Sequence, residues 1–220
     1  MLSLMIKRVG YWYRKHGVVG LLKLFFVRVW CRLFQNGHVM FYADLREVPD
    51  EGYSPPPGIT VEGYAHEADI PDADMERLAS KKGGREIFHA SLDKFFRRGA
   101  IFWVVKLNQE PAGYHWSMVG GVEGFYGIPM TAKDLVLVAS EVVPEFRGKG
   151  INPAMIRHIL VQVKRQGFVR AFIACATWNK ANLRSIRKTS FKPYATSHEY
   201  RILGRYITSW KASQFRKRIV

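Results

Sequence analysis

The sequence contains few cysteines, only Cys31 and Cys175, and neither has a potential metal-binding partner near it in the chain. A disulfide-rich secreted domain needs several cysteines at regular spacing, and a zinc site needs closely spaced Cys and His residues. Neither pattern is present. We therefore expect no metal site, and we interpret the protein as one of a reducing compartment, the cytoplasm.

Long apolar runs are also missing. Residues 17–35 are strongly apolar, but Lys23, Arg28 and Arg32 interrupt them, and the uninterrupted run is only Leu24–Val27. A membrane-spanning helix needs about 20 apolar residues, and each basic residue near the bilayer centre costs about 2.5–3.5 kcal/mol. The basic residues and the lack of a small-residue cleavage site also argue against a signal peptide.

The same segment has the pattern of an amphipathic basic helix. Its basic residues are five and four positions apart, which places them on one helical face. Another face is apolar and consists of Val18, Leu22, Phe25, Val29 and Leu33. Helices of this kind lie in the interface of anionic membranes. We therefore predict that residues 1–36 form an arm that binds the cytoplasmic membrane surface, with packing on its own domain or on a partner chain as the alternative.

Acidic residues are scarce at both ends of the chain, and the net charge is +16. Residues 1–43 contain no acid, and beyond Arg147 only Glu199 is acidic. Basic surfaces of this kind meet phosphates, anionic lipids or acidic proteins. No zinc-finger spacing, RNA-recognition box or basic zipper accompanies the charge, so nucleic acid is not favoured as a partner.

Apolar periodicity and turn residues predict an α/β (α+β) fold. Strands are expected over residues 38–44, 59–64, 100–108, 112–120, 135–143, 169–177, 191–197 and 199–207, and helices over 69–98, 151–166 and 180–189. This order predicts a mixed, mainly antiparallel twisted sheet with helices on both faces. The chain then divides into the arm (1–36), a strand with a proline-rich linker (37–58), the sheet domain (59–210) and a basic C-terminal tail (211–220).

The loop at residues 147–151 lacks the full signature of either common phosphate-binding motif. A P-loop needs Ser or Thr after its lysine, but Gly150 follows Lys149. A dinucleotide fingerprint needs a third glycine where this chain has Pro153. What remains is a strand end followed by a glycine-rich helix N-terminus, with Asn152 as the expected N-cap. Its free amides and the helix dipole favour an anion such as a diphosphate.

Two motifs in this half of the chain resemble the GNAT acyltransferase superfamily. The stretch Glu145-Phe146-Arg147-Gly148-Lys149-Gly150 resembles the coenzyme A signature, which is Gln or Arg, two residues, Gly, one residue, then Gly or Ala. Residues 179–191 resemble the family's second motif, a helix that begins with Asn and ends before a Phe. The two motifs are separated by a predicted helix and strand, as in the family. The resemblance covers about residues 59–207 and implies a GNAT fold.

The resemblance implies direct transfer of an acyl group from a thioester to an amine. The expected donor is acetyl-coenzyme A, a longer acyl-coenzyme A or an acyl carrier protein thioester. The backbone amide of Val142 or Val143 is expected at the carbonyl oxygen, and Asn179 at the pantetheine arm. The expected phosphate-binding groups are the amides of Arg147, Gly148, Lys149, Gly150 and Ile151, with the side chains of Arg147, Lys149 and Arg184.

Glu141 is the expected catalytic base, because family members often carry a glutamate at the end of this strand. His115 and Glu123 are the alternatives, and an ordinary exposed strand-end acid is the non-catalytic interpretation of Glu141. Many relatives have a tyrosine that protonates the leaving thiolate where this chain has Ile186. Tyr194 or solvent is therefore expected to supply that proton.

Two functions remain open from the sequence. The first is an amine acyltransferase, and the alternative is a catalytically degenerate GNAT-like protein that binds an anionic membrane or nucleic acid through its basic surface. Ile186 and Ser190, in place of the family's tyrosine and glycine, favour the alternative, whereas the intact glycine loop favours the enzyme. Cys175, within an apolar strand, is expected to be a core residue. No motif identifies the acceptor amine or an oligomeric state.

Overall fold

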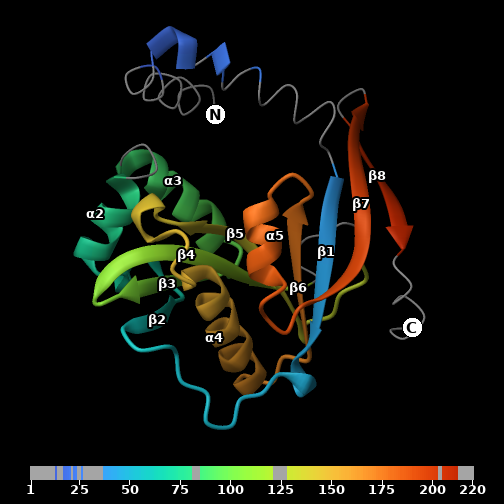
Figure 1. Ribbon diagram of the computed structural model, residues 1–220, viewed down its shortest axis with the longest axis horizontal. Coiled ribbons are helices and arrows are strands. Elements are labelled where there is room, and N and C mark those ends of the chain that lie inside the picture. Colours follow the sequence, from blue (N-terminus) through green and yellow to red (C-terminus); the bar gives the residue numbers. More distant parts are fainter. Residues whose placement is uncertain are drawn as a thin grey trace.

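The computed structural model of the protein (Figure 1) describes residues 37–80, 85–120, 128–202 and 205–212, together with residues 13, 17–20, 22, 23 and 26 of the arm. For 85–87 and for 199–212 it describes the backbone only. Several predictions therefore lie outside the described residues: most of the apolar face of the arm, the candidate base Glu123, and the tail beyond Ala212.

One mixed sheet organises the domain. Its strands are β1 (Gly37–Asp44), β2 (Ile59–Tyr64), β3 (Ile101–Leu107), β4 (Glu110–Val119), β5 (Asp134–Val142), β6 (Arg170–Ala176), β7 (Lys192–Ile202) and β8 (Arg205–Ala212). The eight strands lie in the order β2-β3-β4-β5-β6-β1-β7-β8. Neighbours are antiparallel except β5 and β6, which are parallel. The predicted mixed, mainly antiparallel sheet is confirmed.

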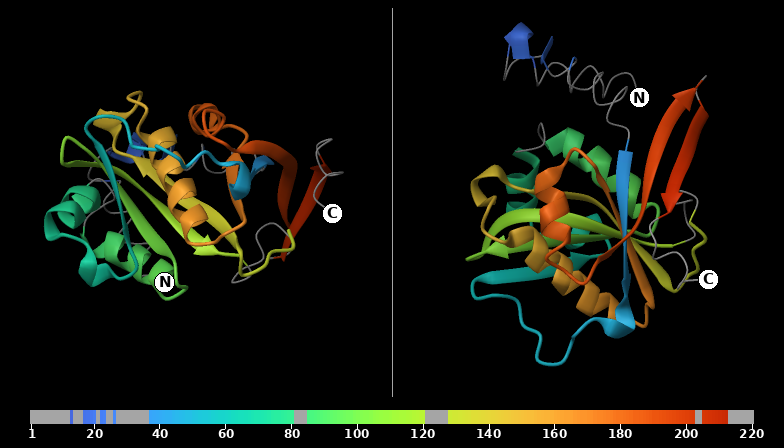
Figure 2. Two further views of the ribbon diagram at one scale, coloured as in Figure 1. Left: turned by 90° about the horizontal axis from the view of Figure 1, so that it is seen from below. Right: turned by 45° about the vertical axis from the view of Figure 1, so that its right-hand side comes forward.

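Helices cover both faces of the sheet, as Figure 2 shows. They are α2 (Asp72–Ser80), α3 (Arg85–Phe96), α4 (Ile151–Arg165) and α5 (Lys180–Ile186), with short 3-10 turns η1 (Leu45–Glu47), η2 (Glu67–Asp69) and η3 (Pro144–Phe146). The ring of Phe102 contacts Phe88 of α3, whereas the next residue, Trp103, contacts His158 of α4. Because successive side chains of a strand point to opposite faces, α3 and α4 lie on opposite sides of the sheet.

Helix α4 supplies much of the core on its side of the sheet. The apolar positions predicted to point inward are Met155, Ile156, Ile159, Leu160 and Val163, and each is 0% exposed. The helix begins at Ile151 with Gly150 as its N-cap, so the prediction of Asn152 as the cap was wrong. Gly150 adopts the cap position because its φ of 75° is accessible to glycine, and this shifts the helix start before Asn152.

Strand β1 belongs to the same sheet as the strands that follow it. It lies between β6 and β7 and is antiparallel to both, with His38 opposite Ala176 and Ser197. The sequence-based boundary at residue 59 left this strand outside the main domain, and the boundary has to move to Gly37. The reason for the error is that its partners are separated from it by most of the chain.

The proline-rich segment after β1 packs on α4 rather than linking two domains. Lys164 donates to the carbonyl of Val48 and to the carboxylate of Asp50, each over 2.7 Å. The Tyr53 hydroxyl lies 3.4 Å from the Ala154 carbonyl oxygen. This segment therefore crosses the outer side of α4 between β1 and β2.

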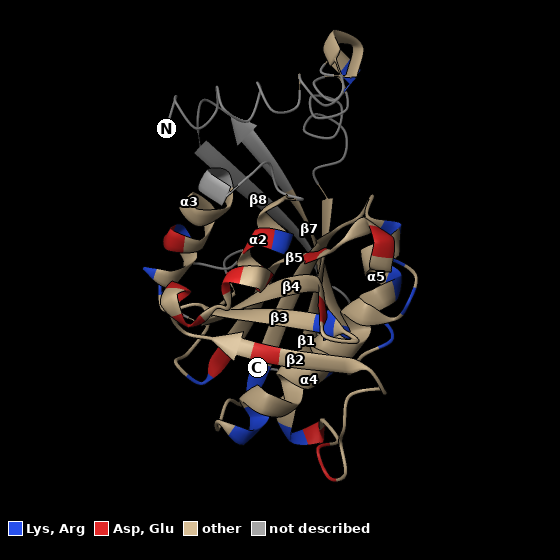
Figure 3. Ribbon diagram, turned by 90° about the vertical axis from the view of Figure 1, so that its left-hand side faces the viewer, with Lys and Arg blue, Asp and Glu red and all other residues tan. Residues whose placement is uncertain are grey.

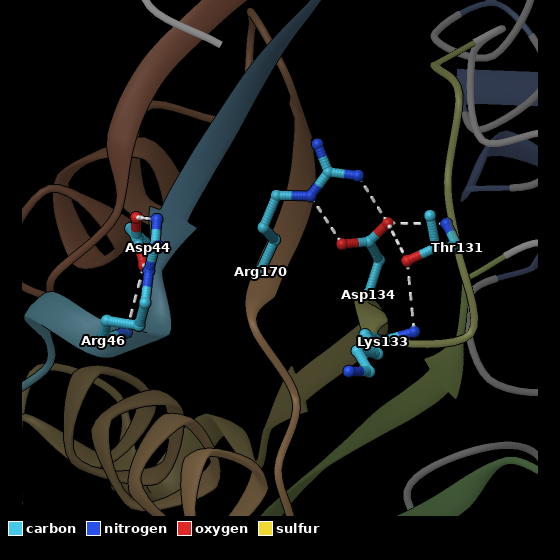
Figure 4. Close-up of polar contacts among 6 residues, drawn as sticks. All are labelled: Asp44, Arg46, Thr131, Lys133, Asp134 and Arg170. Carbon is cyan, nitrogen blue, oxygen red and sulfur yellow. Dashed lines mark hydrogen bonds and ion pairs between the residues drawn. The ribbon is translucent and has the colours of Figure 1, made fainter. Parts of the chain in front are cut away.

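A buried ion pair holds the first residues of β5 and β6 in register (Figure 4). Asp134, 1% exposed, is paired with Arg170 across the parallel strands, and two nitrogens of the Arg170 guanidinium each donate over 2.6 Å to its carboxylate. The Thr131 amide also donates to Asp134 over 2.6 Å. Burial opposes ionisation of Asp134, but these hydrogen bonds outweigh it and hold its pKa below the usual range.

Candidate functional site

Strands β5 and β6 separate after four residue pairs. Their parallel pairing runs from Asp134 opposite Arg170 to Leu137 opposite Ile173 and then ends, although both strands continue. Next to this point Ala139 has a φ of 49°, and the register between β4 and β5 shifts by one residue. A bulge of this kind bends its strand away from its neighbour. The C-terminal half of β5 is therefore free of pairing on the β6 side.

Val142 is the residue whose backbone faces this opening. The Val143 amide donates to the Ala112 carbonyl oxygen over 2.9 Å, so it is not free for a ligand, and the oxyanion role predicted for it was wrong. Because hydrogen-bonded and non-bonded pairs alternate in an antiparallel ladder, the backbone groups of the preceding Val142 point away from β4. In agreement, the Val142 carbonyl oxygen accepts from Arg147 Nε over 3.1 Å.

The glycine loop after η3 presents a run of backbone amides. Gly148 and Gly150 have φ values of 82° and 75°, which side-chain-bearing residues rarely adopt. A Cβ on either residue would meet no atom within 4 Å, so open space lies beside the loop. Alternating left-handed residues turn successive N–H groups toward one concave side. The predicted amide of Arg147 is not among them, because it donates to the Pro144 carbonyl oxygen over 3.2 Å.

These amides open on a cleft of about 690 Å³ between the loop and α5. Besides Glu141, Val142 and the glycine loop, its lining includes Asn152, Asn179, Asn182, Arg184, Ser185 and Lys188. Asn179 is the N-cap of α5, and its side-chain oxygen accepts from the Asn182 amide over 3.1 Å. The Nδ2 group of Asn179 can still donate, and its predicted contact with the pantetheine arm stays a prediction.

Basic side chains border the cleft. Arg147, Arg184 and Lys188 line it. Lys149 instead lies over the ring of Phe146, 5.2 Å from its centroid. Arg184 and Lys149 are exposed, so both can move toward a bound phosphate. The loop amides and the side chains therefore present positive charge to the same space.

Asn152 connects the two walls of the cleft. Its Nδ2 group donates to Asn182 over 3.0 Å and to Ser185 over 2.8 Å. Its Oδ1 atom is buried without a hydrogen-bond partner among the described residues. Buried polar atoms are normally hydrogen-bonded, so this oxygen is an acceptor available to a ligand in the cleft.

The two predicted catalytic side chains are not brought together. Glu141 lies at the cleft, opposite Tyr114 of β4, whose hydroxyl is 3.4 Å from the Glu141 carboxylate. Tyr194 lies on β7, three strands from β5, where its ring contacts Tyr42 and Phe172. With neighbouring strands about 4.8 Å apart, it is about 14 Å or more from β5. The prediction of Tyr194 as the acid was therefore wrong.

The other candidate side chains are buried in the core. His115 is 1% exposed, and burial lowers its pKa to about 4 despite the contact of its Nδ1 atom with the Trp116 carbonyl oxygen. Ile186 is 0% exposed, and Cys175 is 3% exposed with its thiol pKa raised by burial. Cys175 is thus the core residue that the sequence predicted, and His115 is not placed at the cleft.

Sequence reasoning missed Tyr114 and the bridging role of Asn152. The pairing of Tyr114 with Glu141 depends on the extra residue at the β5 bulge, and nothing in the run Val138-Ala139-Ser140 announces a positive φ. Asn152 was predicted only as a helix cap, because its partners on α5 follow from the packing of α4 beside α5 and leave no signal in the sequence.

Neither a membrane-spanning helix nor a metal-binding group of side chains is found among the described residues. Among the residues described, none of the helices has the length and apolar character needed to cross a bilayer. In the same part of the chain, no three His, Cys, Asp or Glu side chains are grouped in a way that could hold a metal ion.

The fold and the cleft define an acetyltransferase-like protein, and sequence comparison agrees. Residues 68–191, more than half of the chain, match the Acetyltransferase (GNAT) family. The chain therefore belongs to the GNAT acetyltransferase family, as its two motifs suggested. A comparison with curated proteins gave no match.

Solved structures with this fold are distant in sequence. The tandem GNAT protein from the clavulanic acid biosynthesis pathway is 15% identical with a TM-score of 0.54, covering 81% of this chain and 54% of its own. A GCN5-related N-acetyltransferase from Sphaerobacter thermophilus is 13% identical with a TM-score of 0.52, covering 92% and 67%. An acetyltransferase from Colwellia psychrerythraea is 12% identical with a TM-score of 0.52, covering 80% and 56%. This chain thus spans little more than half of the length of two of the three, and the likeness is one of fold.

Proposed function

We propose that the protein transfers an acyl group from an acyl-coenzyme A thioester to an amine. The observation that carries this proposal is the convergence of two sets of free backbone donors on one cleft. The amides of the glycine loop face the space where a diphosphate would lie, and the Val142 amide faces the opening between β5 and β6. An acyl-coenzyme A molecule can place its diphosphate at the glycine-loop amides and its thioester carbonyl at the Val142 amide.

In the proposed reaction the amine nitrogen attacks the thioester carbonyl carbon directly. The carbonyl oxygen gains negative charge, and the Val142 N–H stabilises it, an interaction worth about 3–4 kcal/mol in comparable sites. Glu141 accepts the proton that the amine loses. The carbon–sulfur bond then breaks, and the thiolate takes a proton from solvent, because no side chain that lines the cleft is assigned as its acid.

The donor and the place of reaction are further parts of the proposal. Acetyl-coenzyme A is the simplest donor, and a longer acyl-coenzyme A or an acyl carrier protein thioester are the alternatives. The acceptor is an amine presented at the cytoplasmic face of a membrane. The support for this location is the arm, which contains no acidic residue and exposes apolar side chains such as Val19, 80% exposed, and Phe26, 70% exposed.

A second function is a coenzyme A-binding protein without transferase activity. The burial of Ile186 at the position where many relatives have a tyrosine favours it. Such a protein would still bind the thioester, so ligand binding and turnover have to be measured separately.

The direct test of the donor is thermal stabilisation by acetyl-coenzyme A in wild type and in Gly150→Ala. The new Cβ is strained at a φ of 75° and protrudes into the open side of the loop. We expect wild type to gain melting temperature with acetyl-coenzyme A or a longer acyl-coenzyme A, and the variant to bind at least about tenfold more weakly, a loss of about 1.4 kcal/mol.

Gly167→Ala is the matched control. Gly167 also has a positive φ, 87°, with open space at its Cβ position, but it lies beyond the other end of α4. This variant should lose a similar amount of intrinsic stability and keep the full ligand-induced shift. An absence of stabilisation by every acyl-coenzyme A in wild type would refute the proposed donor.

A further inference from the structure

Exposed apolar side chains are concentrated at one end of the molecule. Among the described residues, the exposed large hydrophobic side chains are Tyr13, Val18, Val19, Leu22, Phe26 and Trp178. All but Trp178 belong to the arm. A tryptophan that is 51% exposed is unusual on the surface of a folded domain, and an exposed large apolar side chain beside basic residues marks a contact surface.

Trp178 lies beside the point where the arm leaves the domain. It is in the connection between β6 and α5, directly after Thr177 and directly before the cleft residue Asn179. The Thr177 amide donates to the carbonyl oxygen of Gly37, the first residue of β1, over 2.9 Å. The arm therefore joins the domain at a residue, Gly37, that is hydrogen-bonded to the neighbour of Trp178.

The surroundings of Trp178 are basic. Helix α5 and the turn after it carry Lys180, Arg184, Arg187 and Lys188, all exposed, and blue segments are seen on α5 in Figure 3. From Arg147 to His198 the sequence contains no Asp or Glu. Arg184 and Lys188 line the cleft and are accounted for by coenzyme A phosphates, but Trp178 and Lys180 do not line it.

We propose that Trp178 and Lys180, at the root of the arm, form a membrane-docking surface of the domain that binds anionic lipid headgroups. Tryptophan prefers the interface of a bilayer, where its apolar ring is buried and its N–H remains near water. Each basic residue near an anionic leaflet strengthens binding about fivefold. The arm ends at Gly37, which is hydrogen-bonded to Thr177, the residue before Trp178. The arm and this surface are therefore close enough to contact the same leaflet.

Anionic lipid fits these observations better than an acidic carrier protein. A carrier would be bound by the basic side chains at the cleft, and that contact would not explain the exposed apolar residues of the arm. Exposed apolar side chains such as Val19 and Phe26, in a segment without acidic residues, match a lipid interface instead. A carrier protein or a second copy of this chain is left as an outcome of the test.

The docking surface has a consequence for the acceptor, which rests on the proposed function. Trp178 is adjacent to Asn179 at the rim of the cleft, so docking brings the cleft close to the headgroup layer. The acceptor class is then an amine held in or near lipid headgroups, for example an aminated lipid, rather than a freely diffusing amine.

The experiment is co-sedimentation of the full chain with vesicles of phosphatidylcholine and phosphatidylglycerol at 3:1, and with pure phosphatidylcholine. Wild type should bind the anionic vesicles, and binding should weaken as salt rises. Trp178→Ala should bind about threefold to tenfold more weakly, since a partly buried aromatic ring is lost from the interface. Lys180→Ala should bind about fivefold more weakly.

Lys133→Ala is the matched control for charge. Lys133 is exposed and immediately precedes β5, whereas Trp178 follows the end of β6, so the two lie at opposite ends of this parallel strand pair. Its vesicle binding should equal that of wild type. Thermal melts of each variant check folding, and acetyl-coenzyme A stabilisation, measured without vesicles, reports separately on the proposed function.

The docking surface would be overturned if Trp178→Ala and Lys180→Ala bound anionic vesicles as strongly as the wild-type protein does. It would also be overturned if the wild-type protein did not bind anionic vesicles at all. A dimer or an acidic carrier protein that covers Trp178, together with no vesicle binding, would have the same meaning. Loss of vesicle binding in the variants with acetyl-coenzyme A stabilisation intact supports it. Vesicle binding without any stabilisation by acyl-coenzyme A would refute the proposed donor and still support the docking surface.

Discussion

Glu141 and Tyr114 face each other across β4 and β5 where β5 has already separated from β6. The Tyr114 hydroxyl is 3.4 Å from the Glu141 carboxylate, and the ring of Tyr114 is held between Phe88 and Phe102. In the reaction proposed above Glu141 is the base, and Tyr114 would orient its carboxylate at the rim of the cleft.

Replacing Glu141 by Gln tests this role. We expect kcat/KM to fall by about 100-fold or more, with acetyl-coenzyme A binding unchanged, because general-base catalysis contributes about 10²–10⁴ in rate. The measurement is thiol release from acetyl-coenzyme A with a panel of amines. Glu51→Gln, an exposed acid in the segment between β1 and β2, should behave as wild type. Full activity of the Glu141 variant would exclude the base.

His115 has a thermodynamic effect rather than a chemical one. Burial keeps it neutral in the folded protein, with a pKa of about 4 against an ordinary value of 6.5. The unfolded chain therefore takes up a proton below about pH 6.5 that the folded chain does not accept until about pH 4. Stability is lost as pH falls through this window and is unaffected by His115 above it.

The expected size of this loss is about 3 kcal/mol between pH 6.5 and pH 4. Urea unfolding at several pH values should show it as a pH dependence that His115→Gln lacks, beyond what the acidic residues contribute to both proteins. The exposed His66→Gln is the control and should keep the wild-type pH dependence. Identical slopes for wild type and His115→Gln would contradict the assignment.

At the scale of elements, the parallel pair of β5 and β6 is held at its start and open at its end. The Asp134–Arg170 pair fixes the register where the strands begin, and the Ala139 bulge directs β5 away after Leu137. The cleft needs both features, because an opening between two strands is stable only if the strands are anchored elsewhere.

Asp134→Asn should therefore destabilise the domain strongly. It removes the charge partner of Arg170 at a position that is 1% exposed, and the expected loss in the free energy of unfolding is about 3–5 kcal/mol. Asp93→Asn breaks the exposed pair of Asp93, on α3, with Arg97 directly after the helix, and should cost less than about 1 kcal/mol. Chemical denaturation of both variants makes the comparison, and equal small losses would show that the buried pair is not an anchor.

At the scale of the whole molecule, the domain is completed by its own N-terminal strand. β1 is paired along both edges, to β6 and to β7. Phe41 within the strand and Leu45 directly after it are 0% exposed. Without β1 the hairpin of β7 and β8 would have no partner in the sheet, since β1 is its link to β6.

Two truncations separate the arm from the domain. Removal of residues 1–36 takes away none of the strand pairing found among the described residues and should leave a cooperative thermal transition. Removal of residues 1–44 deletes β1 and should abolish that transition, as circular dichroism and solubility would report. If the shorter chain still melted cooperatively, β1 would be an accessory strand.

The sequence predicted the parts of this molecule that depend on local pattern. The five inward positions of α4 and the glycine loop were recognised from spacing alone, because helix periodicity and turn chemistry are local. The place of β1, the availability of Val142 rather than Val143, and the separation of Tyr194 from Glu141 were not. Each of these features depends on which strands become neighbours and in what register. Pairing between strands that are far apart in the chain produces no periodic pattern in the sequence.

The position of β1 also governs the order in which the protein can be completed. This strand leaves the ribosome before every other strand of the sheet, yet its first partner does not exist until the chain has been synthesised to Ala176, and its second until His198. Contacts of such long range form late and slow the folding of a domain. Until residue 176 has been synthesised, the nascent chain therefore carries a basic, apolar arm and an unpaired strand. An arm already held at a surface would keep that strand away from other chains until β6 and β7 have formed.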